Sequence, residues 1–379
     1  MNYSIIAEQI VLYKSNESLF PKIELIKEDK STINGKITDK KGDPLSYATV
    51  FIANTTFGSI TDKNGFYRLD RIPYGQHILV VSYVGFETSM VTIVVDKASI
   101  EHNVKLKQST IKLDEVKVVE DKRKNKWNQN FKKFKDYFIG TTPNATYCEI
   151  TNPQYLRFHF NKDTKTLTAE SNEILIIENK ALGYRIHYLL ELFELRRNGS
   201  SIYLGKARFE PLAPANSFEA YEWKNNRQNA YYGSFRHFLT SLANNTLADE
   251  EFTATLSHSM IPKHKVYGKI PITKRERFSV GWEILISPRN FLYEKELRFN
   301  EYLHVLYKNE PEDNLYKKWQ NPTYKLQSFQ QSWIELQRSY AIFHVDGYLY
   351  NPTDIIFYGY WAWEKMAEAI PEDYFPNDD

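Results

Sequence analysis

Residues 33–106 read INGKITDKKGDPLSYATVFIANTTFGSITDKNGFYRLDRIPYGQHILVVSYVGFETSMVTIVVDKASIEHNVKL, and this stretch decides the fold. Short apolar runs with a period of two residues alternate with Gly, Pro and Asn-Gly turn signals, and no helical period interrupts them. The pair Asn64-Gly65 lies between two such runs and predicts a hairpin, because both residues accept a positive φ angle. About seven strands over roughly 75 residues predict a β-sandwich.

Four groups of residues in this stretch carry a family resemblance. They are Gly35, Ile37, Asp39, Gly42, Pro44, Leu45, Ala48 and Val50; Thr61, Asp62, Gly65, Tyr67 and Leu69; Pro73 and Gly75; and VSYVGF at 81–86. In this order they resemble the carboxypeptidase-regulatory-like domain. The resemblance implies a prealbumin-like, seven-stranded, non-catalytic sandwich. Such domains occur at the N-terminus of TonB-dependent outer-membrane receptors and related envelope proteins, so the resemblance also implies an envelope setting.

The rest of the chain divides around this module, which gives a β-rich multidomain fold class. Residues 1–30 form an N-terminal remnant, in which YSIIAEQIVL at 3–12 resembles the last hairpin of a short domain of secretins and TonB-dependent receptors. The sandwich occupies 31–107, a linker with a basic helix occupies 108–138, and an α+β domain occupies 139–379. A chain of 379 residues has room for two to three domains.

The C-terminal half resembles a group of envelope-associated proteins of unknown function. The residues that carry this resemblance lie at 138–148, 178–184 and 230–238. The resemblance transfers no activity. Tyr231, Phe235, Phe238 and Leu242 are spaced four, three and four apart and predict a helix within 223–243, and a second helix is expected over 360–370.

The linker contains a run of lysines interleaved with aromatic residues. Trp127, Phe131, Phe134 and Phe138 are spaced four, three and four apart, which is the apolar stripe of an amphipathic helix. Two interpretations follow. The helix packs its aromatic stripe on the next domain, or it makes a peripheral contact with an anionic membrane through Trp127, Phe131 and Phe134.

Composition restricts the partners and the location of the chain. A net charge of +2 argues against a nucleic-acid binder, and the single cysteine excludes an intramolecular disulfide. No apolar run approaches the roughly 20 residues of a membrane span, and no signal peptide is visible. The envelope resemblance then predicts that the chain begins inside a longer precursor and works in the periplasm or on the periplasmic face of the outer membrane. The alternative is a cytoplasmic protein with a stray N-terminal strand.

The search for chemistry leaves one candidate site. No zinc-peptidase motif, phosphate-binding loop or nucleophile elbow is present, so no catalytic residue, metal or cofactor is predicted. Residues 222–237 are the densest in reactive side chains. A helix that begins at Ser234 would offer backbone amides to a carboxylate, phosphate or sugar. The candidate ligand-binding residues are Arg227, Tyr232, Ser234, Arg236 and His237.

The sequence favours a non-enzymatic function. A capped helix with a buried, hydrogen-bonded histidine explains residues 222–237 without any ligand. The main hypothesis is therefore an envelope-associated binding or assembly module that contacts a protein or a glycan. The alternative is a hydrolase of an unfamiliar type with its site around residues 222–237.

Overall fold

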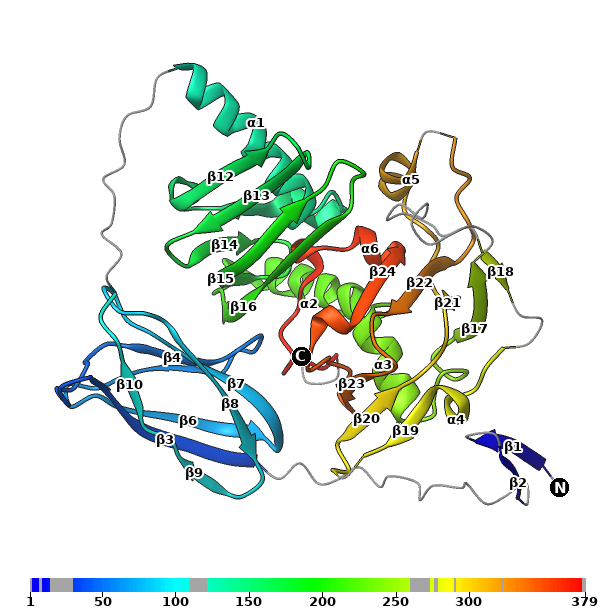
Figure 1. Cartoon of the computed structure of the whole chain (residues 1–379), viewed down its shortest axis with the longest axis horizontal. Helices are drawn as coiled ribbons and strands as arrows, with labels where there is room; N and C mark the ends of the chain where they lie inside the picture. The colour runs from blue at the N-terminus through cyan, green and yellow to red at the C-terminus, as the bar shows by residue number, and fades with distance from the viewer. Residues whose placement is uncertain are drawn as a thin grey trace.

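A computed structural model describes the chain over eight ranges: 2–6, 9–13, 30–109, 121–259, 273–275, 279–289, 291–321 and 323–376. A β-sandwich lies at one end of the molecule, and the C-terminal half contains further sheets with helices beside them (Figure 1). At the N-terminus, β1 (Asn2–Ile6) pairs antiparallel with β2 (Gln9–Tyr13).

The sandwich consists of two four-stranded sheets. Its strands are β3 (Lys30–Asp39), β4 (Thr49–Ile52), β5 (Gly58–Ile60), β6 (Phe66–Pro73), β7 (Gly75–Ser82), β8 (Ser89–Val95), β9 (Ser99–Glu101) and β10 (Val104–Leu106). One sheet has the order β5-β4-β7-β8, and the other has β3 between β6 and the pair β9 and β10. Both β9 and β10 run parallel to β3, so the last edge strand is interrupted and eight strands replace the expected seven. At the interruption, the carbonyl of His102 accepts the hydroxyl of Tyr67 at 2.8 Å.

The turn at Asn64-Gly65 differs from the expected hairpin. It joins β5 to β6, which belong to opposite sheets and do not pair with each other. Gly65 has φ +79°, and a Cβ at this position would lie 2.5 Å from the carbonyl oxygen of Ile37. The carboxylate of Asp62 accepts the backbone N–H groups of Asn64 and Phe66. The prediction of a turn at Asn64-Gly65 is therefore correct, but the prediction of a hairpin is wrong. The close approach of Gly65 to Ile37, and not the pairing of two strands, requires the glycine.

The C-terminal half begins with helix α1 (Asp121–Phe138), which packs against an antiparallel sheet of six strands. The strands are β11 (Cys148–Ile150), β12 (Leu156–Asn161), β13 (Thr166–Ser171), β14 (Leu175–Asn179), β15 (Tyr184–Leu195) and β16 (Ser201–Pro211). Their order is β11-β14-β15-β13-β12, and β16 also pairs with β15. Short 3-10 helices lie at Pro143–Tyr147 and Pro153–Tyr155.

The aromatic stripe of α1 faces this sheet, and the membrane interpretation of the stripe was wrong. Phe134 and Phe138 are fully buried. The ring of Trp127 stacks on Phe131, and its indole N–H donates to the carbonyl of Leu156 at 3.1 Å. The sheet offers enough apolar surface to cover the stripe, and Lys126, Lys132 and Lys133 lie on the exposed side of the helix. No helix within the described ranges combines the length and apolar character needed to cross a membrane.

Helices and smaller sheets complete the C-terminal half. The helices are α2 (Ser217–Tyr231), α3 (Phe235–Ala243), α4 (Trp282–Leu285), α5 (Asn314–Gln320) and α6 (Tyr360–Trp363), with 3-10 turns at Pro352–Asp354 and Met366–Glu368. A five-stranded sheet contains β18 (Thr273–Arg275), β17 (Phe252–Ser259), β21 (Tyr302–Tyr307), β22 (Gln330–Leu336) and β24 (Ile355–Gly359). A three-stranded sheet contains β19 (Ile286–Pro288), β20 (Glu294–Leu297) and β23 (Ala341–His344).

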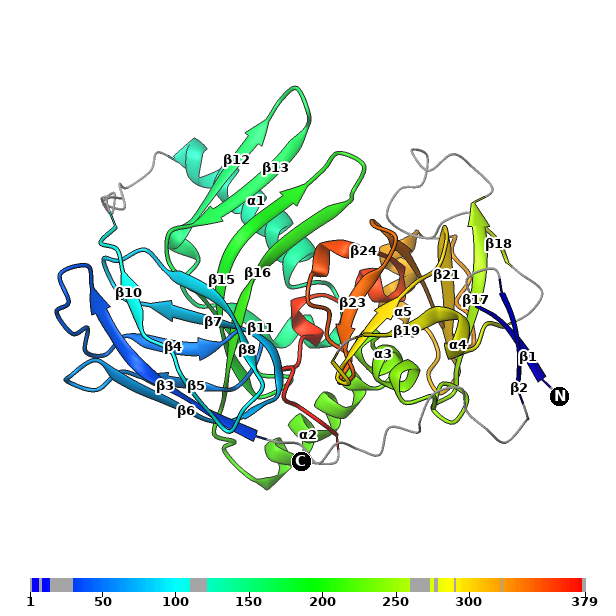
Figure 2. The same ribbon diagram turned by 60° about the horizontal axis from the view of Figure 1, so that its bottom comes forward.

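Two expected helices are broken. The helical stretch within 223–243 divides at Gly233, which has φ +76° and lies against the ring of Tyr307. The expected helix over 360–370 ends at Trp363, and only a 3-10 turn follows after Lys365. The chain then continues to residue 376 along the side of the sandwich, where the red segment lies between the sandwich and α2 (Figure 2).

Truncation of Phe134 tests the docking of α1. We expect Phe134→Ala to lower the free energy of unfolding by about 3–5 kcal/mol, because it removes a fully buried ring from the contact with the six-stranded sheet. Lys133→Ala, on the exposed side of the same helix, is the matched control and should change the value by less than about 0.5 kcal/mol. Urea titration measures both, and an equal effect of the two variants would contradict the packing described for α1.

Candidate functional site

His237 lies at the start of α3 and uses both of its ring nitrogens. Ser234 caps the helix, since its hydroxyl accepts the N–H of His237 at 3.1 Å. The N–H of Gly233 donates to Nδ1 of His237 at 3.2 Å, and Nε2 lies 3.1 Å from a carboxylate oxygen of Glu250. Because Nδ1 accepts, the neutral ring carries its proton on Nε2 and donates it to Glu250. Burial lowers the pKa of His237, so the imidazole stays neutral in this position.

Arg236 connects α3 to two distant segments. Its guanidinium donates to the carbonyl of Asp346 at 3.1 Å, to that of Pro371 at 2.8 Å and to that of Glu372 at 2.6 Å. It also lies over the rings of Tyr231 and Phe375. The side chain is therefore committed to holding the C-terminal segment against α3.

The other predicted site residues also hold elements together. Arg227 donates to the carbonyl of Leu182 at 3.1 Å and lies over the ring of Tyr184. The ring of Tyr232 packs edge-on against His237, with 5.3 Å between centroids. The structure places Tyr232 and Ser234 between α2 and α3 beside His237, whereas Arg227 contacts residues 182–184 and Arg236 contacts the C-terminal segment. Within the described residues, no three His, Cys, Asp or Glu side chains are grouped so that they could hold a metal ion.

The sandwich is joined to the C-terminal half along a seam that we define by loop 53–57, strand β16 and residues 371–376. Asn54, in the loop, forms four hydrogen bonds that cross this seam. Its N–H donates to the carbonyl of Ala207 at 2.6 Å, and its side-chain oxygen accepts the N–H of Ala207 at 3.2 Å. Its carbonyl accepts the N–H of Glu372 at 2.8 Å, and its side-chain amide donates to the Glu372 carboxylate at 3.0 Å. One residue therefore ties together three segments that are remote in sequence.

Neighbouring residues extend the seam on both sides of Asn54. Thr55 forms a parallel bridge with Arg208, and its carbonyl accepts the N–H of Phe209 at 2.9 Å. The N–H and hydroxyl of Thr56 donate to the two carboxylate oxygens of Asp373. The loop thus adds to the edge of β16 as a short strand, the same backbone chemistry by which sheet edges bind extended peptides.

A cavity of about 400 Å³ lies along this seam. Its walls come from the sandwich loop, the β15–β16 hairpin and the chain around 350–353 and 366–372, and they include Asn54, Tyr188, Tyr203, Lys206, Tyr350 and Glu372. Lys206 forms an ion pair with Glu191 at 3.1 Å in the same wall. Burial raises the pKa of Tyr203 to about 12, so its hydroxyl is protonated at neutral pH. The volume and the mixture of aromatic and polar walls are those of a small-ligand site between domains.

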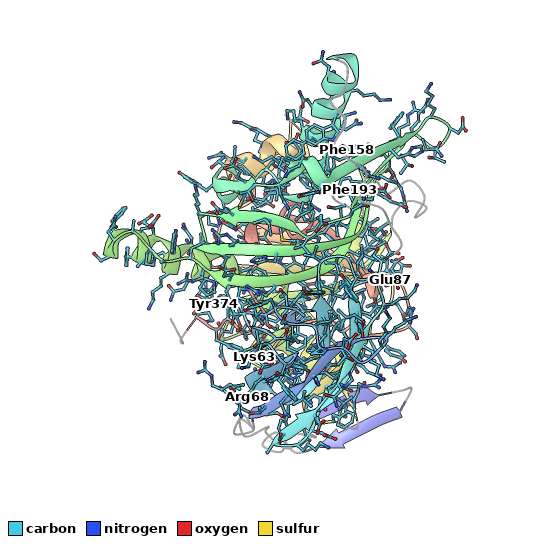
Figure 3. All side chains as sticks on the ribbon, turned by 90° about the vertical axis from the view of Figure 1, so that its left-hand side faces the viewer. Lys63, Arg68, Glu87, Phe158, Phe193 and Tyr374 are labelled. Carbon is cyan, nitrogen blue, oxygen red and sulfur yellow. The ribbon has the colours of Figure 1, made fainter. Side chains whose placement is uncertain are left out.

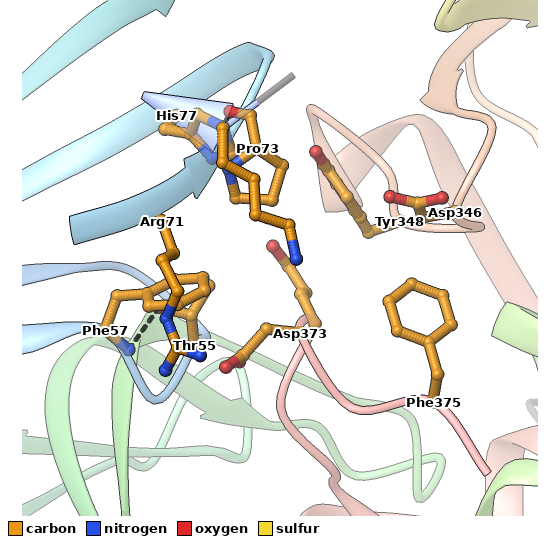
Figure 4. Close-up of a pocket in the computed structure, with 11 residues that line it drawn as sticks. Thr55, Phe57, Arg71, Pro73, His77, Asp346, Tyr348, Asp373 and Phe375 are labelled. Atoms are coloured by element: carbon orange, nitrogen blue, oxygen red, sulfur yellow. Dashed lines mark hydrogen bonds between the residues drawn. The ribbon is translucent and has the colours of Figure 1, made fainter. Parts of the chain in front are cut away.

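A second, smaller cavity of about 70 Å³ lies at the other side of the seam (Figure 4). His77 of the sandwich, Tyr348 and Asp346 of the C-terminal half, and Asp373 of the C-terminal segment point toward it. Nε2 of His77 lies 2.9 Å from the carbonyl of Pro73, and burial lowers the pKa of His77 to about 4. Glu372 lines both cavities, and burial raises its pKa to about 7.

Comparison with known proteins identifies the first part of the chain. Residues 33–118 match the family model of the CarboxypepD_reg-like domain, so the chain carries a domain of this family. TonB-dependent receptor P39 of Formosa agariphila is 36% identical over 90 residues, which is 24% of this chain and 8% of the receptor. TonB-dependent receptor SusC of Bacteroides thetaiotaomicron is 35% identical over 88 residues, which is 23% of this chain and 8% of the receptor. The matches thus span less than a tenth of the length of these relatives.

Solved structures resemble the chain only locally. A mutant type II cohesin–X-dockerin complex from Acetivibrio cellulolyticus has 20% identity and a TM-score of 0.19, and covers 20% of this chain and 56% of its own. Catechol 1,2-dioxygenase from Acinetobacter has 16% identity and a TM-score of 0.20, and covers 26% of this chain and 58% of its own. Scores this low support no conclusion about the present chain.

Asn54→Ala tests the seam. The variant loses two side-chain hydrogen bonds and places alanine at φ +63°, so we expect it to lower the free energy of unfolding by about 2–4 kcal/mol. Amide exchange at Phe209, which donates to Thr55 across the seam, should accelerate in parallel. Asn64→Ala, in the exposed turn of the same sandwich, is the control. Unchanged exchange at Phe209 in Asn54→Ala would contradict the role given to Asn54.

His77 and Glu372 should give the seam opposite dependences on pH. The pKa of His77 falls from 6.5 to about 4 on folding, so its stabilising contribution is complete above pH 6.5 and is lost as the pH falls toward 4. The pKa of Glu372 rises from 4.5 to about 7, so its contribution is complete below pH 4.5 and is lost as the pH rises toward 7. In His77→Gln and Glu372→Gln, an amide that can still form hydrogen bonds replaces the group that titrates.

The two variants are compared with the parent protein by urea unfolding between pH 5 and pH 8. Relative to the parent, His77→Gln should gain stability as the pH falls, and Glu372→Gln should gain stability as the pH rises. Each slope is at most about 1.4 kcal/mol per pH unit, the value for one proton. Curves of both variants that run parallel to that of the parent would contradict these pKa directions.

Proposed function

We propose that the chain is a non-enzymatic binding module of the bacterial envelope that works on the periplasmic side of the outer membrane. Two findings support this location: the CarboxypepD_reg-like domain at 33–118 and the matching segments in two TonB-dependent receptors. Because the matches cover a small part of those receptors, the proposal concerns a binding role and not transport. In this proposal, the sandwich and the C-terminal half act as one unit joined by the seam.

The observation that carries the proposal is the cavity of about 400 Å³ along the seam. The cavity wall includes Tyr188, Tyr203 and Tyr350, and tyrosine combines an apolar ring with a hydroxyl, a combination that suits the C–H and O–H groups of a sugar. Asn54, Asn351 and Glu191 supply donors and acceptors for hydroxyl groups. We therefore propose a short segment of an envelope glycan as the ligand, with an extended segment of an envelope protein as the second candidate.

The hydrolase alternative gains no support from the α2–α3 residues. His237 does lie beside the carboxylate of Glu250, but its second nitrogen accepts the N–H of Gly233. A general base needs a free ring nitrogen within reach of substrate. The binding role is therefore the function that these contacts favour.

A cavity-filling substitution tests the binding role. Ala369 lines the cavity, and Ala369→Trp would occupy much of its volume. We expect isothermal titration calorimetry with a panel of soluble oligosaccharides to detect binding to the parent protein and an affinity at least about tenfold lower for Ala369→Trp, since the ring would displace ligand from the walls. Ala213→Trp, at an exposed position outside the cavity, is the matched control and should bind as the parent does.

Two results would count against the glycan. One is an absence of binding to every oligosaccharide, and the other is equal binding by Ala369→Trp and Ala213→Trp. In the first case, cross-linking from Asn351→Cys in the cavity wall would test the second candidate, an envelope protein segment.

A further inference from the structure

The end of the sandwich that points away from the seam carries exposed apolar side chains. Strands β3, β5 and β7 end there, and β4, β6 and β8 begin there. We define the distal tip by three loops, 40–48, 61–65 and 83–88, with the adjoining Ile60 and Phe66. The exposed fractions of its apolar side chains are 82% for Val84, 77% for Tyr47, 58% for Ile60 and 53% for Phe66. Single exposed apolar residues are ordinary, whereas several at one end of a domain mark a contact surface.

Strand register brings three of these residues close together. Thr49, at the start of β4, pairs with Ile60 on one side and with Ser82 on the other. The N–H of Tyr47 donates to the carbonyl of Thr61 at 3.0 Å. Val84 follows Ser82 by two residues in a turn in which Gly85 has φ +82°. Ile60 at the end of β5, Tyr47 just before β4 and Val84 just after β7 therefore lie at the same end of one sheet.

Tyr47 has a strained backbone that its own packing does not explain. Its φ angle is +66°, in the left-handed region that disfavours a bulky side chain. With 77% of its surface exposed, the side chain gains little from burial in return. Strained residues that persist without packing are typical of binding sites. Glycine or asparagine would hold the same turn at lower cost, so the aromatic ring itself is the feature to explain.

The charged side chains of the distal tip differ in whether they have partners within the chain. Lys40, Lys41 and Lys63 are exposed, and among the described residues none of the three forms an ion pair (Figure 3 looks onto this end and labels Lys63). The carboxylates of Asp39 and Asp62 each accept two backbone N–H groups within their own turns. Asp43 is exposed, and Glu87 pairs with Lys107 at 2.6 Å. Within the three loops, Lys40, Lys41 and Lys63 are matched in number by Asp43, Asp62 and Glu87, so charges of both signs lie beside the apolar residues.

We propose that the distal tip inserts into the surface of a phospholipid bilayer. In this arrangement Tyr47, Ile60 and Val84 enter the headgroup region, and the three lysines contact lipid phosphates. A bilayer fits better than a protein surface for two reasons. Separate loops at the narrow end of a sandwich make a projecting surface rather than a flat one (Figure 1), and aromatic and aliphatic side chains beside lysines are the combination that interfacial anchors use. The inference is independent of the glycan, because the proposed ligand cavity lies at the opposite end of the sandwich.

Sedimentation with vesicles of phosphatidylethanolamine and phosphatidylglycerol tests the proposal. The parent protein should sediment with the vesicles, and the double variant Tyr47→Ser/Val84→Ser should bind at least about tenfold more weakly, because it loses two apolar side chains from the contact. The matched control is Phe218→Ser/Tyr221→Ser on α2, where the exposed fractions are 70% and 60%. This control should bind as the parent does.

Two further variants separate a direct contact with the bilayer from a loss of binding caused by misfolding. Compared with the parent protein, which already contains seven tryptophans, Val84→Trp should add fluorescence that shifts to shorter wavelength with vesicles and that is quenched by lipids carrying a quencher in the bilayer. Tyr47→Gly should raise the melting temperature while it weakens vesicle binding, because it relieves the left-handed strain and removes the ring.

Several outcomes would overturn the proposal. They are an absence of vesicle binding by the parent protein, an equal loss in the α2 control, an unshifted Val84→Trp spectrum, and a lower melting temperature for Tyr47→Gly. If the tip variant abolishes a concentration-dependent self-association of the free protein instead, a second copy of this chain is the partner and the membrane proposal fails.

Discussion

The joint between the sandwich and the C-terminal half is centred on the hydrogen bonds of Asn54. In most loop residues the backbone N–H and carbonyl each form one hydrogen bond, and a polar side chain often bonds only to water. At Asn54 the left-handed conformation turns the backbone groups and the side chain outward together, so that all four polar groups cross to other segments. Asn54 holds β16 and Glu372, and Glu372 lines both cavities along the seam. Of the walls of the larger cavity, Asn54 therefore holds the parts that Ala207 and Glu372 contribute.

Electrostatics along the seam follow from the same burial. Closing the seam removes His77 from water, which favours its neutral form, and also removes Glu372, which favours its protonated form. The histidine therefore releases a proton on burial and the glutamate takes one up. Because the two effects have opposite signs over the overlapping range between pH 4.5 and 6.5, the seam as a whole should depend less on pH than either group does alone.

The features that sequence could predict are those that neighbouring residues determine. Turn residues such as Gly65, the period-two runs of the sandwich and the Ser234 cap of α3 each depend on a few adjacent positions, and all are present. The interruption between β9 and β10 could not be predicted, because it depends on Tyr67 from another strand. The seam was missed for the same reason: Asn54 and Glu372 are 318 residues apart. Arg236 was noticed for its charge, yet its partners are backbone carbonyls, which carry no signature in the sequence.

Two left-handed residues of the sandwich show how the same conformation can serve different ends. Asn54 and Tyr47 lie at opposite ends of β4 and have nearly equal φ angles, +63° and +66°. For Asn54 the cost of the conformation is offset inside the molecule by bonds to Ala207 and Glu372. For Tyr47 no comparable contact of the ring is present among the described residues, and most of the ring faces solvent. At the Tyr47 end of the strand, the backbone N–H bonds to the carbonyl of Thr61 within the sandwich while the ring faces solvent, so the ring is the part of this residue that remains available for a contact outside the chain.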